Sequence, residues 1–219
     1  MKPRKPNDLL FEQVARVGKA VASPKRLELL DLLSQGEKTV ETLANDASID
    51  VKLASAHLKV LKEARLVEAR REGRFINYSL SGSDVANLWL NLRAVAEKHL
   101  VELRVALELM SSAPERLTAE SRASLLEKAR LGEVIVIDVR PEVEYHAGHL
   151  PFARSMPLSE IERRLAELPP GKEIVAYCRG PFCLMSDEAV GLLRKKGFRA
   201  QKITDGVAEW AADGLPIEA

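Results

Sequence analysis

The sequence predicts two domains: a mainly helical domain with a β-hairpin over residues 1–111, and an α/β domain with a mostly parallel sheet over residues 112–219. The length of 219 residues suits two domains near the common size of about 100 residues. Apolar residues recur at helical spacing as far as Met110, whereas short continuous apolar runs alternate with helical segments beyond it.

Composition narrows the class of protein. With 46% hydrophobic and 30% charged residues and no low-complexity tract, the chain is typical of soluble globular proteins. No apolar run reaches the length of a signal peptide or a membrane span, so we expect a cytoplasmic protein that does not bind membranes. Residues 1–110 hold 18 Lys and Arg against 15 Asp and Glu, and the remainder 15 against 17. Because this difference is small, motifs must decide whether the chain binds nucleic acid.

Periodic apolar residues predict a cluster of helices in the first domain. Four short helices are expected from Leu9 to Val21, Lys25 to Ser34, Thr39 to Asp46 and Val51 to Ala64. Two extended runs around Gly73 then predict a hairpin. One long helix is expected from Ser83 to Met110, and its apolar stripe needs a partner surface.

The second domain alternates strands and helices. Ser111-Ser-Ala-Pro114 interrupts the long helix, and a short helix is expected over residues 119–129. The apolar runs that begin at Val134 and Ile174 are typical of strands buried on both faces. Further helices are expected over residues 158–168 and 187–196. This alternation predicts a mostly parallel sheet.

The fourth predicted helix has the two faces that a groove-binding helix needs. Val51, Ala54, Leu58 and Leu61 form its apolar stripe. The small and basic residues that fall largely away from this stripe are Lys52, Ser55, Ala56, Lys59 and Lys62. Such a helix fits a major groove, where Ser55 and His57 would reach base edges, and Lys52 and Lys59 would contact bases or phosphates.

The sequence His57-Leu-Lys-Val-Leu61, followed by Ala64-Arg-Leu-Val67, resembles the helix-turn-helix of ArsR/SmtB repressors. The resemblance extends from about Leu9 to Leu109 and implies a winged helix-turn-helix that binds a double-stranded DNA operator. It places Arg70, Arg71 and Arg74 on the wing, where family members set basic residues against the DNA backbone.

The same resemblance implies a homodimer, built from the helices Leu9 to Val21 and Ser83 to Met110, which would read a palindromic operator. Each feature also has a simpler interpretation. Charged residues can merely solvate a helix face, His57 can pack or cap, and the apolar stripe can be buried within its own chain.

Metal-sensing relatives carry cysteines on the helix before the recognition helix, but residues 34–47 hold neither cysteine nor histidine. A second family site uses Asp, His and Glu of the last helix. Asp84, His99 and Glu102 are present here, but Ala86 and Leu88 stand where a second histidine would be expected. We therefore expect no metal site and no cofactor.

In the second domain, Val136-Ile-Asp-Val-Arg-Pro-Glu-Val-Glu-Tyr-His-Ala-Gly-His-Leu-Pro151 resembles the early signature of rhodanese-like domains. Asp205-Gly-Val-Ala-Glu-Trp210, followed by Gly214-Leu-Pro216, resembles their ending. The resemblance covers about Ala119 to Ile217. We expect Asp138 and Arg140 to brace a loop by hydrogen bonds rather than to do chemistry.

The candidate sulfur-carrying residue is Cys178, which ends a predicted strand just before a helix. In such a turn, backbone N–H groups and the positive helix terminus favour the thiolate, which can attack the outer sulfur of thiosulfate or a persulfide. Arg179 would add positive charge, and Gly180 would allow tight geometry. The loop continues through Pro181, Phe182, Cys183 and Leu184. The alternative is an inert buried cysteine.

Cys183 and Leu184 stand where rhodaneses often carry a basic residue followed by serine or threonine. This departure favours sensing over turnover. Cys183 could resolve a persulfide on Cys178, or it could simply pack.

Three hypotheses follow. The first is a homodimeric repressor whose operator affinity responds to the sulfur or redox state of Cys178. The second is a thiosulfate or persulfide sulfurtransferase with an attached DNA-binding domain, and the third is a metal- or arsenic-responsive repressor.

Overall fold

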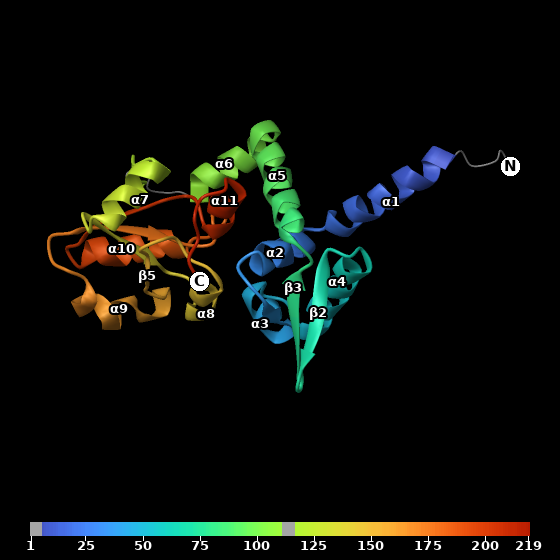
Figure 1. The fold of residues 1–219 in the computed structure, drawn as a ribbon, viewed down its shortest axis with the longest axis horizontal. Helices are drawn as coiled ribbons and strands as arrows, with labels where there is room; N and C mark the ends of the chain where they lie inside the picture. Colours follow the sequence, from blue (N-terminus) through green and yellow to red (C-terminus); the bar gives the residue numbers. More distant parts are fainter. Residues whose placement is uncertain (1–5, 111–116) are drawn as a thin grey trace. The chain divides into compact units, whose positions relative to one another are not determined.

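The computed structural model describes residues 6–110 and 117–219. The chain divides into two compact units, Met1–Leu92 and Arg93–Ala219 (Figure 1). The predicted boundary near Ser112 and the interruption at Pro114 lie outside the described residues. The two predicted classes of domain are confirmed, whereas the boundary between residues 111 and 112 stays a prediction.

The helices of the first unit begin at the residues that the sequence provides for helix starts. Pro24 occupies the first turn of α2, where its fixed φ and missing N–H cost nothing. The Thr39 side chain accepts a hydrogen bond from Thr42 N at the start of α3, and Asp50 Oδ1 accepts one of 2.8 Å from Leu53 N at the start of α4. The helices are α1 (Pro6–Val21), α2 (Pro24–Leu33), α3 (Val40–Asp46) and α4 (Val51–Glu63).

A hairpin follows α4, as the extended runs around Gly73 predict. Strands β2 (Val67–Glu72) and β3 (Phe75–Leu80) pair antiparallel in a register that sets Glu72 opposite Phe75. Gly73 turns the chain with φ +59°, a conformation that glycine adopts without steric cost. A two-residue strand, β1 (Lys38–Thr39), which the sequence pattern did not predict, pairs with β3 on its other edge.

The core of the first unit is aliphatic and draws on every helix of the helix-turn-helix. Leu29 and Leu30 of α2 pack with Leu43 of α3 and with Leu58 and Leu61 of α4, all at most 1% exposed. Burying a leucine side chain contributes about 1.5–3 kcal/mol. This core fixes one face of α4 and leaves the other face free to meet a partner.

The predicted single helix from Ser83 to Met110 is wrong in one respect. The structure has two helices, α5 (Ser83–His99) and α6 (Val101–Met110), which meet at Leu100 with different axis directions (Figure 1). The apolar spacing did not reveal the break because both helices keep the same period of 3.6 residues. No proline or glycine marks the bend in the sequence.

The second unit contains a four-stranded sheet in the order β5-β4-β6-β7, with every neighbouring pair parallel. This confirms the predicted sheet. The two central strands had been predicted, whereas the edge strands are too short to show a pattern in the sequence. The strands are β4 (Val134–Asp138), β5 (Arg154–Ser155), β6 (Glu173–Tyr177) and β7 (Arg199–Lys202).

Helices cover both faces of this sheet, which is why β4 is buried along its whole length. Ile137 of β4 faces a core shared with α9 and α10, and Val136 faces a core shared with α7 and α11. The sequence pattern missed α8 and α11. These helices are α7 (Arg122–Arg130), α8 (Glu142–Ala147), α9 (Ile161–Arg164), α10 (Met185–Lys195) and α11 (Val207–Ala212).

The predicted helix over residues 158–168 is also wrong as a single element. It consists of the 3₁₀ turn Leu158–Glu160, the short helix α9, and a second 3₁₀ turn, Leu165–Glu167. Pro157 and Pro169 flank the segment, and its apolar spacing does not mark where the 3₁₀ turns replace the α-helix.

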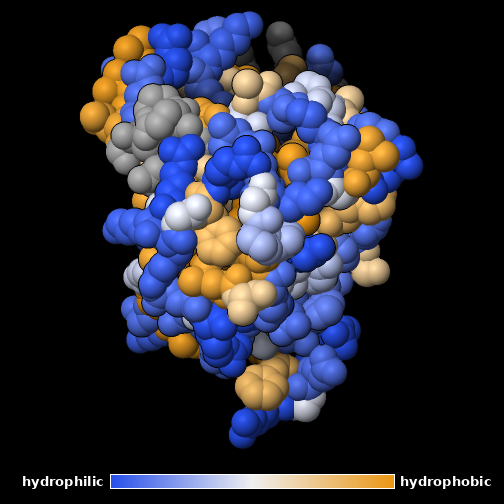
Figure 2. Space-filling view, turned by 90° about the vertical axis from the view of Figure 1, so that its left-hand side faces the viewer, coloured by the Kyte–Doolittle hydropathy of each residue, from blue (hydrophilic) through white to orange (hydrophobic). Residues whose placement is uncertain are grey.

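The face of the molecule in Figure 2 is mostly hydrophilic, with hydrophobic residues in separate groups, as is ordinary for a folded chain. None of the helices in the described part of the chain is both long and apolar enough to cross a membrane.

Candidate functional site

The exposed face of α4 carries the residues that the sequence predicts to meet DNA. Lys52, Ser55, Ala56 and Lys59 are exposed, and their spacing of three and four residues places them along one face of the helix. His57 is half-buried at the edge of that face.

The opposite face of α4 is held by Ala54, Leu58 and Leu61, each fully buried. Val51 does not belong to this buried face, contrary to the predicted stripe. It is 44% exposed because it occupies the first position of the helix, at the margin of the core.

The hairpin presents Arg70, Arg71 and Arg74 at the surface. Arg70 and Arg71 are neighbours on β2, so their side chains leave opposite faces of the ribbon. On one face, Arg70 Nη2 donates to Glu37 Oε1 at 2.7 Å. Arg74, in the turn, lies 4.9 Å above the Phe75 ring. The sequence grouped these arginines, whereas the structure places the two on β2 on opposite faces of the ribbon.

The cysteine loop connects β6 to α10 and closes around the sulfur of Cys178, which is only 2% exposed. Cys178 Sγ lies 3.3 Å from Ser186 Oγ and 3.4 Å from the carbonyl oxygen of Cys183. Gly180 has φ +132°, which a residue with a side chain rarely adopts. The loop therefore curls tightly enough to surround one sulfur atom.

The surroundings of Cys178 favour its thiolate. A hydrogen bond from the Cys183 thiol, opposed by burial and aided by the Ser186 hydroxyl and by backbone N–H groups, lowers the pKa of Cys178 to about 6. The same contact and burial raise the pKa of Cys183. These opposite shifts favour the thiolate form on Cys178 rather than on Cys183.

Arg179 anchors the loop. Its Nε lies 2.9 Å from Glu144 Oε2 and its Nη2 lies 2.5 Å from Glu144 Oε1, and Glu144 is 1% exposed on α8. The positive charge that the sequence suggests for an anionic sulfur donor is thus balanced by a buried carboxylate.

The remaining predicted loop residues differ in exposure. Pro181 and Cys183 are half-buried, whereas Phe182 is 36% and Leu184 42% exposed.

Asp138 and Arg140 form a fully buried pair at the end of β4. Arg140 Nη2 lies 2.6 Å from Asp138 Oδ2 and 2.7 Å from the carbonyl oxygen of Gly148. The Tyr177 hydroxyl, on the neighbouring strand β6, donates to Asp138 Oδ2 at 2.6 Å. These bonds join the end of β4 to the residue that precedes Cys178.

Sequence reasoning missed one residue near the sulfur and two partners of the loop. Ser186 follows the loop without any motif of its own. Glu144 and Glu209 were visible in the motifs, but no pattern indicated that they contact Arg179 and the backbone near Gly180.

Within residues 6–110 and 117–219, no three His, Cys, Asp or Glu side chains come together as a metal site would require.

These two sites define the class of protein. A helix-turn-helix with a hairpin wing presents small and basic residues, and a parallel α/β domain encloses a cysteine between a strand and a helix. The chain is a winged helix-turn-helix protein with a rhodanese-like domain.

Comparisons with known proteins identify the family. Residues 23–69 match the family "Bacterial regulatory protein, arsR family", and residues 121–213 match "Rhodanese-like domain". The chain is 46% identical over 209 residues to the HTH-type transcriptional regulator Rv0324 of Mycobacterium tuberculosis, covering 95% of this chain and 92% of that protein. The protein belongs to this ArsR family of DNA-binding transcriptional regulators and carries a rhodanese-like domain.

Two further relatives match single parts of the chain. A sulfurtransferase of Allochromatium vinosum is 33% identical over 88 residues, which are 40% of this chain and 80% of that protein. The homodimeric winged helix-turn-helix DNA-binding domain of a Mycobacterium bovis protein is 45% identical, with a TM-score of 0.43 over 47% of this chain and 94% of that fragment.

Proposed function

We propose that the protein is a homodimeric repressor whose affinity for its operator falls when Cys178 gains a sulfur atom or becomes oxidised. The observation that carries this proposal is the enclosed sulfur of Cys178, which lies 3.3 Å from Ser186 Oγ and shares its loop with a second free cysteine, Cys183. A single reactive sulfur in a transcriptional regulator suits a sensor.

The DNA-binding part of the proposal rests on the exposed face of α4. Its N-terminal residues, Lys52, Ser55 and Ala56, would enter the major groove, while the wing arginines would approach the DNA backbone. Because phosphates are the same in every DNA sequence, the loss of one phosphate contact would lower the affinity for DNA without changing the operator sequence that the protein prefers. Ser55 and His57 would provide the base contacts.

The dimeric state rests on apolar residues at the surface of the predicted dimerisation helices. On α1, Leu10, Phe11 and Val14 are 68%, 74% and 71% exposed, and Leu109 of α6 is 76% exposed. Large apolar residues at the surface are typical of an interface with another chain, and the related M. bovis domain is a homodimer. A dimer with two-fold symmetry would bind a palindromic operator.

The sulfur chemistry is a nucleophilic displacement. The Cys178 thiolate attacks the outer sulfur of a persulfide, the S–S bond of the donor breaks, and the donor leaves as a thiolate. With thiosulfate the leaving group is sulfite. In both cases Cys178 ends as a persulfide, whose charge the backbone N–H groups near Gly180 and Ser186 would stabilise.

Cys183 provides a second step. The Cys183 thiol passes its proton to the outer sulfur of the Cys178 persulfide, and the Cys183 sulfur attacks the inner sulfur. A disulfide between the two cysteines forms, the S–S bond of the persulfide breaks, and hydrosulfide leaves. The sensor would then hold an oxidised loop without keeping the donated sulfur.

The test uses the full chain and a DNA duplex that the protein itself selects from a random library. We expect sodium polysulfide or a cysteine persulfide to weaken binding in a fluorescence-anisotropy titration, and mass spectrometry to locate the added sulfur on Cys178. Cys178→Ser should bind DNA as the untreated protein does and should not respond. An unchanged affinity after stoichiometric loading of Cys178 would contradict the proposal.

A second candidate function is sulfurtransferase activity, favoured by the similarity to the A. vinosum sulfurtransferase. Multiple turnovers of thiosulfate with cyanide or a thiol as acceptor, lost in Cys178→Ala, would support an enzyme. One sulfur per chain and no turnover would support the sensor.

A further inference from the structure

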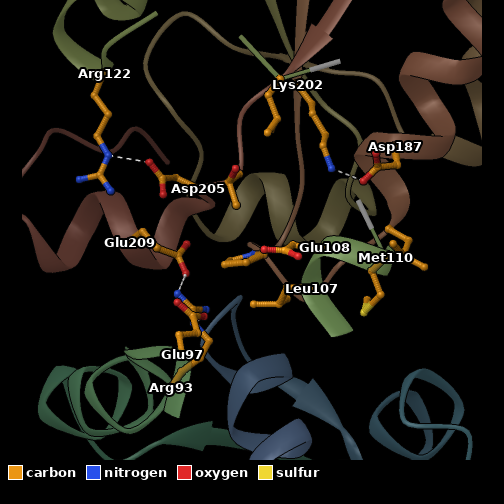
Figure 3. Close-up of a pocket in the computed structure, with 14 residues that line it drawn as sticks. Arg93, Glu97, Leu107, Glu108, Met110, Arg122, Asp187, Lys202, Asp205 and Glu209 are labelled. Atoms are coloured by element: carbon orange, nitrogen blue, oxygen red, sulfur yellow. Dashed lines mark hydrogen bonds and ion pairs between the residues drawn. The ribbon is translucent and has the colours of Figure 1, made fainter. Parts of the chain in front are cut away.

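The strongest feature outside the cysteine loop is an ion pair between helices of the second unit that lie far apart in sequence. Arg93 of α5 donates from Nη2 to Glu209 Oε1 of α11 at 2.7 Å (Figure 3). Arg93 is 8% and Glu209 9% exposed. Both charges are largely shielded from water, and Arg93 Nε also lies 3.2 Å from Glu97 Oε1 on the same helix, so Glu209 depends on Arg93 while Arg93 has two carboxylate partners.

Glu209 in turn contacts the cysteine loop. Its Oε2 accepts a hydrogen bond of 2.7 Å from Gly206 N, and its Oε1 lies 3.0 Å from where a Cβ on Gly180 would stand. A Cβ on Gly206 would lie 2.7 Å from the Cys178 carbonyl oxygen. The backbone around Cys178 therefore touches α11 with no room for an extra atom.

Arg93 also reaches the loop directly. Its guanidinium carbon lies 5.6 Å from the centre of the Phe182 ring, within the range of a cation–π contact. One side chain of α5 thus meets the loop at Phe182 and, through Glu209, at Gly180.

The sulfur that Cys178 would accept has to change this arrangement. A persulfide adds one large atom inside a closed loop, where Cys178 is only 2% exposed. Closely packed interiors respond to an added atom by moving their neighbours. Glu209 and Arg93, which contact the loop at Gly180 and Phe182, line a cavity of about 800 Å³ (Figure 3).

Helix α5 also takes part in the first unit. Val85 lies in the core there, and Trp89 Nε1 donates to Asp31 Oδ1 of α2 at 2.7 Å. Arg93 comes four residues after Trp89, one turn along the same helix face. A displacement of Arg93 therefore acts on the helix that holds Trp89.

We propose that Arg93 and Glu209 form the contact through which a change at Cys178 reaches α5, with Arg93 as the positioning residue. The inference rests on the proposed function, because it explains how a loaded cysteine would alter DNA binding. It requires that α5 has two arrangements and that the state of the cysteine loop changes their relative populations.

The test follows Trp89 by fluorine NMR in the full chain labelled with 5-fluorotryptophan. The chain contains two tryptophans, and Trp210→Phe assigns their resonances. Cys178 is modified in two arms, by sodium polysulfide and by iodoacetamide, and mass spectrometry measures the modification. We expect both modifications to shift the Trp89 resonance in the native chain.

Three variants make the test specific. Arg93→Met removes the charge and should abolish most of the Trp89 shift, whereas Arg93→Lys keeps the charge and should retain it. Arg163→Met, which removes an exposed ion pair with Glu160 on the same unit, serves as the matched control and should behave as the native chain. A purely structural role for Arg93 would not be rescued by lysine.

The outcomes separate the two proposals. A full Trp89 shift in Arg93→Met, or no shift in the native chain after complete alkylation of Cys178, would overturn the role of Arg93. If polysulfide adds no sulfur to Cys178, the proposed function fails, while the iodoacetamide arm still decides on Arg93.

Discussion

The exposed face of α4 and the cysteine loop are built in opposite ways. Lys52, Ser55 and Lys59 stand at the surface of a helix whose other face is anchored, so they can meet a large partner without rearrangement. Cys178 is enclosed, and hydrogen bonds with Cys183 and Ser186 lower its pKa. The first site can change without loss of the fold, whereas stability and chemistry are linked in the second.

The largest expected effect is on the stability of the second unit, which contains the enclosed cysteine. In Arg140→Met, the Asp138 carboxylate keeps its Tyr177 hydrogen bond but loses its cation in a fully buried position. We expect the free energy of unfolding of the second unit to fall by about 3–5 kcal/mol, measured by urea denaturation.

The matched control is Arg130→Met, which removes an equally short ion pair with Glu127 on an exposed surface. The urea midpoint should stay where it is. If both substitutions had the same effect, burial would not be what gives the Asp138–Arg140 pair its importance.

The next effect tests the exposed site. Lys52→Ala should weaken DNA binding several-fold and lower the slope of log affinity against log salt by about 0.9, as expected for one lost phosphate contact. Anisotropy titrations at several salt concentrations measure this. The urea midpoint should not change, because Lys52 is exposed.

Glu68→Ala, on an exposed position of β2, is the matched control for a surface substitution in the same unit. An unchanged salt slope in Lys52→Ala would mean that this lysine does not contact a phosphate. A changed sequence preference instead would assign it to the bases.

The smallest effect sharpens the electrostatics of the cysteine loop. Cys183→Ala removes the hydrogen bond that contributes most to lowering the pKa of Cys178 from its ordinary value to about 6. The pKa of Cys178 should rise, so a smaller fraction is thiolate at pH 7 and iodoacetamide should react about twofold or more slowly there.

At a pH above the ordinary cysteine pKa, the native chain and Cys183→Ala should react at similar rates, because Cys178 is then ionised in both. Cys183→Ser, which keeps a hydrogen-bond donor, should lie between them at pH 7. Identical pH profiles for all three chains would show that Cys183 does not control the ionisation of Cys178.

The sequence predicted those parts of the molecule that are governed by short-range periodicity. The anchored face of α4, the turn at Gly73 and the two buried strands follow from spacings within a dozen residues. The break at Leu100, the short strands β5 and β7, and the 3₁₀ turns around α9 could not be predicted in this way, because they are too short or do not alter the period.

The same distinction between short-range spacing and tertiary packing applies to the candidate sites. The sequence alone determined the two classes of domain, the position of Cys178 between a strand and a helix, and the residues on the open face of α4. Only the tertiary structure decided what surrounds the sulfur: Ser186 beside it, Glu144 on Arg179, and Glu209 with Arg93 behind the loop. Arg93 and Glu209 are 116 residues apart, and a contact across that separation depends on how the elements pack and leaves no periodic signal in the chain.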